Sequence, residues 1–182
     1  MMERIHITGS SGSGTTTLGG ALAERLSYQH FDTDNYFWLP TNPPFQKKRE
    51  LEDRQTLLMT DLDSTDRWIL SGSLSGWGDI FIPRFDLVVY LWISKDLRIE
   101  RLVKRETRRY GKTEIEVGGK MYSAFNDFIQ WASDYDNGGL NMRSKAMHEQ
   151  WMASLNCKVL RLEGNMSVEE RVETVIETIR KN

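Results

Sequence analysis

The sequence predicts an α/β fold in which a five-stranded parallel sheet is covered by helices on both faces. Short β-rich segments alternate with helical segments along the 182 residues, as they do in parallel sheets. The unbroken apolar run FDLVVYLWI (85–93) is typical of a central strand buried on both faces. A glycine-rich turn joins the first predicted strand to the first predicted helix. Ligands of such sheets bind at the carboxyl ends of the strands, so the loops at 9–16, 32–38 and 71–78 and the region after 105 are the candidate ligand-binding regions.

The strands are predicted from short β-rich or apolar runs. RIHIT leads into the glycine-rich turn, YQHFDTD ends in two acids, and WILSG and CKVLRL are apolar runs between polar segments. Together with the central run, the predicted strands are 4–8, 28–34, 67–72, 85–93 and 157–162.

The helices are predicted from apolar spacing and end signals. Leu18, Leu22 and Leu26 lie four residues apart and form one apolar face. Gly111 closes the helix that follows the central strand, and Ser167 with Glu170 fits a capping box. The predicted helices are 16–26, 47–62, 95–111, about 118–135, about 140–155 and 167–181.

Composition indicates a cytoplasmic protein that is a monomer or a homodimer. The net charge of −2 argues against a nucleic-acid binder, which needs a basic surface. We expect no signal peptide and no membrane partner, because no apolar run reaches the length of a span. His6 lies within a predicted strand and is expected to be structural. The spacing of histidines and of the single cysteine, Cys157, predicts no zinc site.

The stretch GSSGSGTTT predicts a phosphate-binding loop. Glycines let the backbone turn tightly, so that several N–H groups point into one concavity. The first turn of the following helix adds unpaired N–H groups and a positive dipole end. The hydroxyl of Thr16 is placed to coordinate Mg²⁺. The residues expected to hold the phosphates are Gly9, Gly12, Ser13, Gly14, Thr15, Thr16 and Thr17.

Thr15 stands where such loops carry a lysine that contacts the β- and γ-phosphates. Threonine donates a hydrogen bond but has no charge. Three interpretations are open: a turn that only connects strand and helix, a loop that binds phosphate without catalysis, and a working loop whose cation comes from elsewhere. We favour the third.

Arginines of the helix 95–111 are candidates for that cation. Arg98, Arg101, Arg105 and Arg108 are spaced 3, 4 and 3 residues apart and share one face, while Ile99, Leu102 and Val103 are expected to face the core. A solvated face is the alternative. The favoured phosphate ligands are Arg101, Arg105 and Arg109, with Arg143 as a further candidate.

Two acids follow the second predicted strand. Asp32 is expected to support Mg²⁺ through its water ligands, and Asp34 to bind the acceptor or take its proton. The alternative is a turn in which aspartates cap local N–H groups. After the third strand, Ser71 occupies the position where many phosphate-loop proteins have an acid, and Gly72 allows close approach to a ligand. Trp77 is predicted either to wall the acceptor pocket or to pack in the core.

These motifs, in this order, resemble those of the adenylate kinase-like small-molecule kinases. GSSGSGTTT, DTD, WILSG, FDLVVYLW and RLVKRETRRYG carry the resemblance, which is specific at the loop. The acid pair is similar to that of the shikimate and gluconate kinase branch. The loop GSGTTT resembles that of archaeal-type cytidylate kinases, which implies that Thr15 is compatible with phosphoryl transfer. The chain lacks the DGFPR-like acceptor motif of adenylate kinases.

The resemblance implies a single domain over 1–182 with an acceptor-side segment at 39–64 and a helical lid at about 110–156. It also implies an ATP- and Mg²⁺-dependent kinase whose partner is a small-molecule phosphate acceptor, either a nucleoside monophosphate or a hydroxyl-bearing metabolite. The alternative is a nucleotide-binding module or sensor with little or no phosphoryl transfer.

Overall fold

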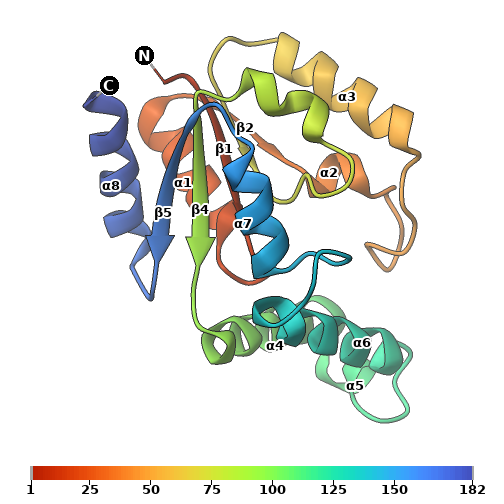
Figure 1. Ribbon diagram of the computed structural model, residues 1–182. Helices are drawn as coiled ribbons and strands as arrows, with labels where there is room; N and C mark the ends of the chain where they lie inside the picture. Colours follow the sequence, from red (N-terminus) through yellow and green to blue (C-terminus); the bar gives the residue numbers. More distant parts are fainter. Residues whose placement is uncertain (1, 182) are drawn as a thin grey trace. The chain divides into compact units, whose positions relative to one another are not determined.

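Five strands form one sheet in a computed structural model that describes residues 2–181 (Figure 1). The strand order is β2-β3-β1-β4-β5, and β1 runs parallel to both β3 and β4, as β2 does to β3. The predicted five-stranded parallel sheet is confirmed. The strands are β1 (Arg4–Gly9), β2 (Gln29–Asp32), β3 (Trp68–Ser71), β4 (Leu87–Trp92) and β5 (Lys158–Glu163).

The chain divides into two compact units. The first comprises Met1–Gly9, Gly14–Leu91 and Leu155–Asn182, and the second comprises Ser10–Ser13 and Trp92–Ser154. The helices of the first unit are α1 (Thr15–Leu26), α2 (Asp34–Phe37), α3 (Leu51–Asp63), the 3-10 helix η1 (Asp79–Arg84) and α8 (Val168–Arg180). Those of the second are α4 (Lys95–Tyr110), α5 (Lys112–Ile115), α6 (Tyr122–Ser133), the 3-10 helix η2 (Asp134–Asp136) and α7 (Lys145–Ala153).

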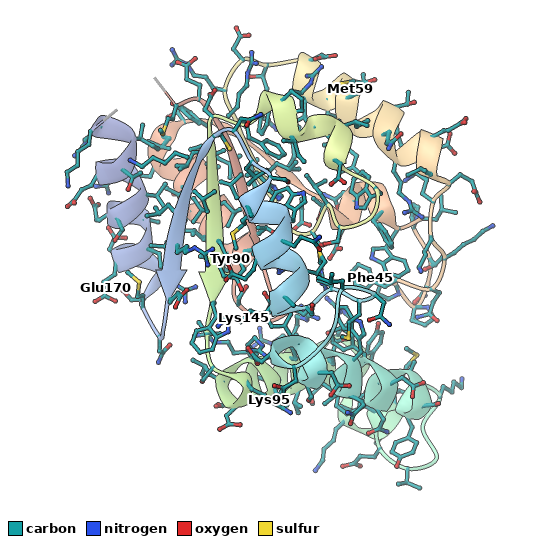
Figure 2. All side chains as sticks on the ribbon, in the orientation of Figure 1. Phe45, Met59, Tyr90, Lys95, Lys145 and Glu170 are labelled. Carbon is teal, nitrogen blue, oxygen red and sulfur yellow. The ribbon has the colours of Figure 1, made fainter. Side chains whose placement is uncertain are left out.

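Successive side chains of the central strands point to opposite faces of the sheet, so the first unit has apolar packing on both faces. Ile5 and Ile7 of β1 and Val89 of β4 pack in one cluster with the apolar residues of α1 and α8. These two helices lie side by side on that face, while α3 lies on the other side of the sheet (Figure 1). By the same alternation, His6 and Tyr90 point to the second face, and both are also buried. Tyr90 is labelled on β4 in Figure 2. Burial on both faces explains why the central strand is an unbroken apolar run.

The last helix begins at the predicted capping box. The Ser167 hydroxyl accepts a hydrogen bond from the Glu170 backbone N–H, and the Glu170 carboxylate accepts one from the Ser167 N–H. This pair of bonds fixes where α8 starts after the loop at 164–167, and therefore which side chains of its first turn face the sheet.

Several element boundaries differ from prediction. The helix predicted over 47–62 begins only at Leu51, and the strand predicted over 28–34 ends at Asp32 because Asp34 starts α2. Val103 was expected in the core but is exposed, whereas Leu102 is fully buried. Arg98 was expected on an exposed stripe of arginines but is fully buried. It donates hydrogen bonds to the Ile93 carbonyl and the Asp136 carboxylate, so it is a structural residue of the second unit.

His6 makes the stability of the first unit depend on pH. Burial lowers the pKa of His6 to about 4, and a hydrogen bond to the Leu70 carbonyl only partly opposes this effect. Between pH 6.5 and 4 the unfolded chain binds a proton that the folded chain does not, so stability falls as pH falls. We expect His6→Asn to lose up to about 3 kcal/mol of this pH dependence. Urea unfolding of both proteins at pH 7 and 4.5 measures it, and parallel pH profiles would contradict it.

Candidate active site

The predicted phosphate loop connects β1 to α1. Gly12 and Gly14 have φ values of +82° and +97°, in the left-handed region that favours glycine. Gly12 also lies against α4 of the second unit, because a Cβ there would be 2.9 Å from the Arg98 carbonyl oxygen. A side chain at Gly12 would therefore displace the loop from α4, which carries the predicted arginines.

The first half of the loop is a closed turn within the second unit. The Ser13 N–H and hydroxyl both donate to the Ser10 carbonyl oxygen, at 3.1 and 2.8 Å. The Arg143 guanidinium donates to the Ser11 hydroxyl at 2.5 Å and lies over the Trp131 ring, 4.8 Å from its centroid. Arg143, which the sequence suggested as a further candidate phosphate ligand, thus contacts the phosphate loop at Ser11.

Thr16 and Asp32 lie together in the first unit. The Thr16 hydroxyl donates to Asp32 Oδ2 at 2.7 Å. The other carboxylate oxygen, Oδ1, accepts a hydrogen bond from the Asp34 backbone N–H at 2.9 Å. The donor set is one hydroxyl and one carboxylate, the kind of partial oxygen shell that Mg²⁺ completes with phosphate and water. These two residues therefore fit the metal that the sequence predicts.

Metal sites built from several protein side chains form a different class from the Thr16 and Asp32 pair. Within residues 2–181, His, Cys, Asp and Glu side chains form no group of three or more that could hold an ion. The fit described above thus concerns a metal that arrives with a phosphate ligand, not one enclosed by the protein alone.

The turn that carries the two acids is fixed by a close approach between the ends of β2 and β3. The Thr33 N–H donates to the Ser71 carbonyl at 2.8 Å, and the Thr33 side chain is buried. Gly72 has φ +111°, and a Cβ there would lie 2.0 Å from Thr33 Oγ1. Gly72 thus allows Thr33 to pack closely at this turn, and its predicted role beside a ligand stays a prediction. Asp34 is exposed at the start of α2.

Ser71 forms a hydrogen bond with a histidine. Its hydroxyl lies 2.9 Å from His30 Nε2, and Ser71 is fully buried. Burial lowers the pKa of His30, an effect that the Asp32 charge opposes. A Cβ on Gly19 of α1 would lie 2.5 Å from the same His30 nitrogen. A glycine at position 19 therefore lets α1 approach His30 and Ser71 closely.

Aromatic and cationic side chains gather near the residues that follow Asp34. The Arg54 guanidinium lies 4.0 Å from the centroid of the Phe37 ring, and Lys48 Nζ lies 5.8 Å from it. Trp77 is buried, with its indole N–H donating to the Ser73 carbonyl and its ring close to that of Phe37. This burial fits the packing role of Trp77, and its role in the wall of the acceptor pocket stays a prediction.

A buried carboxylate holds two of the predicted arginines of α4. Glu106 is 4% exposed and accepts hydrogen bonds from Arg105 Nε at 2.7 Å and from Arg109 Nη1 at 2.8 Å. The Arg105 guanidinium also lies 5.7 Å from the centroid of the Phe128 ring of α6. Arg101 is half-buried one turn earlier on the same helix. Glu106 was not singled out from the sequence, because its role depends on which face of α4 is covered.

Arg171 is a second residue that sequence reasoning missed. It lies in the first turn of α8, is 3% exposed, and has Nη1 3.4 Å from the position of a Cβ on Gly14. The available signal was its place on the apolar face of this helix, one residue before Val172 and four before Val175.

The chain matches a known protein family over most of its length. Residues 5–121 match the family model described as AAA domain, which is more than half of the chain. The chain belongs to this family. Uncharacterized protein YqaC of Bacillus subtilis (strain 168) is 51% identical to this AAA-domain protein over 182 residues, which covers 100% of both chains.

More distant relatives of the AAA-domain protein are kinases. A cytidylate kinase of Methanocorpusculum labreanum is 32% identical over 114 residues, 57% of this chain and 63% of that one. A shikimate kinase of Acinetobacter baumannii (strain AYE) is 28% identical over 120 residues, 59% of this chain and 65% of that one. Each match spans less than two thirds of the kinase's own length.

Solved structures share the fold of this AAA-domain protein. The shikimate kinase of Acinetobacter baumannii in complex with shikimate has a TM-score of 0.61 at 18% identity and covers 100% of this chain and 95% of its own. The deoxyadenosine kinase of M. mycoides with bound dATP has a TM-score of 0.56 at 14% identity, covering 97% and 99%. The fold is therefore that of the P-loop kinases. None of the helices between residues 2 and 181 combines the length and the apolarity needed to cross a bilayer.

Proposed function

We propose that this AAA-domain protein is an ATP-dependent kinase that transfers the γ-phosphoryl group to a small acceptor. The observation that carries the proposal is the hydrogen bond between Thr16 and Asp32, followed at once by the exposed carboxylate of Asp34. It supports a metal-binding pair made by the first turn of α1 and the end of β2, with a candidate base two residues after Asp32. The cytidylate and shikimate kinases that the sequence resembles support the same class of reaction.

Each loop residue has a proposed task. The backbone N–H groups from Gly12 to Thr16 hold the β- and γ-phosphates, helped by the positive end of α1. Thr16 and Asp32 hold Mg²⁺, which, when bound, offsets the negative charge of the phosphates. Gly9, Ser13, Thr15 and Thr17 shape the loop and donate hydrogen bonds to it or to the nucleotide.

The proposed transfer is a direct displacement. An oxygen of the acceptor forms a bond to the γ-phosphorus as the bond to the oxygen bridging the β- and γ-phosphates breaks, and ADP leaves with that bond's electrons. If the acceptor is a hydroxyl, Asp34 takes its proton. If the acceptor is a nucleoside monophosphate, a phosphate oxygen attacks without losing a proton, and Asp34 orients the acceptor.

Arginines of the second unit are proposed to stabilise the transferring phosphoryl group. Arg143 already contacts the loop at Ser11, and α4 lies against the loop at Gly12. Arg105 and Arg109 are held by Glu106 and would exchange this carboxylate for phosphate when nucleotide binds. Arg101, one turn before Arg105, is proposed to contact the nucleotide.

The acceptor is proposed to carry negative charge. Arg54 and Lys48 lie over the Phe37 ring, three residues after Asp34, and favour an anionic group close to the base. Both predicted classes contain such acceptors, since nucleoside monophosphates and hydroxy acids are anions. The segment 39–64, which contributes these two cations, is the proposed acceptor side, and about 110–156 is the proposed lid.

A nucleotide-binding module with little phosphoryl transfer is the second candidate function. Thr15, which lacks the lysine charge, favours it, as does the pairing of Arg105 and Arg109 with Glu106. This candidate predicts ATP binding without a phosphorylated acceptor.

Asp32→Asn tests the metal-binding part of the proposal. Loss of one carboxylate charge beside Thr16 is expected to raise the Mg²⁺ concentration for half-maximal ADP formation about 10- to 100-fold. The same titration of Asp53→Asn, an exposed acid of α3, is the control and should match the unchanged protein. An unaltered Mg²⁺ requirement in Asp32→Asn would exclude Asp32 as a metal ligand.

A further inference from the structure

Arg171 is a charged residue on a helix face that otherwise belongs to the core. It is 3% exposed, and its neighbours Val172 and Val175 on α8 pack with Leu22 of α1 in the apolar cluster. A buried guanidinium needs polar or negatively charged groups around it. The groups that lie close to Arg171 therefore indicate what its charge can serve.

The guanidinium reaches the phosphate loop. Arg171 Nη1 lies 3.4 Å from where a Cβ on Gly14 would be, and Nη2 donates to the Gly164 carbonyl oxygen at 3.3 Å. Gly14 is the residue immediately before Thr15 and the N-cap of α1. Arg171 therefore places a permanent positive charge next to the loop position that lacks lysine.

The local field increases the effect of this charge. Arg171 lies in the first turn of α8, and its guanidinium lies at the first turn of α1. Helix N-termini carry partial positive charge, which attracts negative groups. The Arg171 cation and the first turn of α1 would therefore attract the same bound polyphosphate.

We propose that Arg171 supplies the bound nucleotide with the positive charge that Thr15 does not provide. The inference rests on the proposed function, because it takes a nucleoside di- or triphosphate as the ligand of the loop. Arg171 acts from behind Gly14 and is a positioning residue rather than a catalytic residue. Its effect should therefore appear in the affinity for phosphates and not in the recognition of the nucleoside.

The test measures binding of ADP and of adenosine by calorimetry to the full chain and three variants. Arg171→Met, which keeps the length of the side chain but removes the charge, is expected to weaken ADP binding about 30-fold. Adenosine binding should stay unchanged. Adding Thr15→Lys to Arg171→Met should restore most of the ADP affinity, because a cation returns to the same phosphates. Thr15→Lys alone should improve ADP binding only slightly.

Control variants distinguish the loss of the Arg171 charge from a general loss of folding. Arg25→Met removes an exposed arginine of α1 that pairs with Glu173, and it should leave ADP affinity unchanged. Arg171→Lys keeps the charge and should retain more ADP affinity than Arg171→Met. If Arg171→Met does not fold, Thr15→Lys in the otherwise unchanged chain tests the inference. A slight gain in ADP affinity is expected. A large gain would show that the loop lacked a cation and would overturn the role of Arg171.

The outcomes distinguish this inference from the proposed function. Equal losses of ADP and adenosine binding in Arg171→Met, with no recovery by Thr15→Lys, would overturn the inference and indicate a structural role. Unchanged ADP affinity in a folded Arg171→Met protein would also overturn it. If the variants change ADP binding as predicted but no phosphorylated acceptor forms, the proposed kinase activity is overturned. The role of Arg171 in nucleotide binding is then still supported. A chain that binds no ADP would overturn both.

Discussion

With a hydroxyl acceptor, replacing Asp34 by asparagine is expected to lower the acceptor-dependent kcat/KM about 10³-fold, which is within the usual contribution of a general base. Asp34 is the exposed first residue of α2, and its backbone N–H is tied to Asp32 by a hydrogen bond. The asparagine side chain has the same shape but cannot take a proton. The turn, and with it the metal pair of Thr16 and Asp32, should stay in place.

The measurement is a coupled assay of ADP release with Mg·ATP and varied acceptor concentration, with ADP affinity measured alongside. Asn35→Ala alters the next residue of the same helix, which is also exposed, and should leave turnover unchanged. Unaltered ADP affinity in Asp34→Asn would show that the loss lies on the acceptor side. Turnover within a few-fold of the unchanged protein would remove Asp34 from the chemistry.

Replacing Arg105 or Arg109 by alanine is expected to lower turnover about 10³-fold if that arginine contacts the transferring phosphoryl group. Both guanidinium groups are held by the buried carboxylate of Glu106 and are thus kept close together and charged. A lysine at Thr15 would carry part of this charge in an ordinary loop. Since it is absent, the loss on removing an arginine should be correspondingly large.

Arg108→Ala is the matched control, because Arg108 is an exposed arginine of the same helical turn. It should keep nearly full activity in the ADP-release assay. Near-normal turnover in both the Arg105 and Arg109 variants would remove the α4 arginines from the account. Loss in Arg108→Ala as well would indicate that net positive charge, and not a particular contact, is what matters.

The sheet and the phosphate loop were predictable because their signals are local. Glycine spacing and strand context identify the loop, and the apolar run identifies the central strand without knowledge of its neighbours. Thr16 and Asp32 were expected at one magnesium site because ligands bind where parallel strands end, but the hydrogen bond between them was not predicted. The four-residue helix α2 and the 3-10 helix η1, which contains Pro83, were not predicted. Both are too short to show the repeating pattern of apolar residues that identifies a helix in a sequence.

Residues whose role depends on what covers them were not predictable. Helical spacing placed Arg98 on a stripe with other arginines, but it did not reveal that Asp136 would bury and pair with it. Glu106 and Arg171 are ordinary charged residues in the sequence, and only the packing of α4 and α8 makes them buried. The same packing exposes Val103, which hydrophobicity alone assigns to the core.

The measurement that tests the central claim most directly is detection of a phosphorylated acceptor by ³¹P NMR. Mg·ATP and the protein are incubated with nucleoside monophosphates, nucleosides, hydroxy acids and polyols in separate reactions. We predict a new phosphorylated product, formed in equal amount to ADP, with an anionic acceptor, and its loss in Asp34→Asn. ADP binding without a new product from any acceptor would contradict the kinase and favour the nucleotide-binding module.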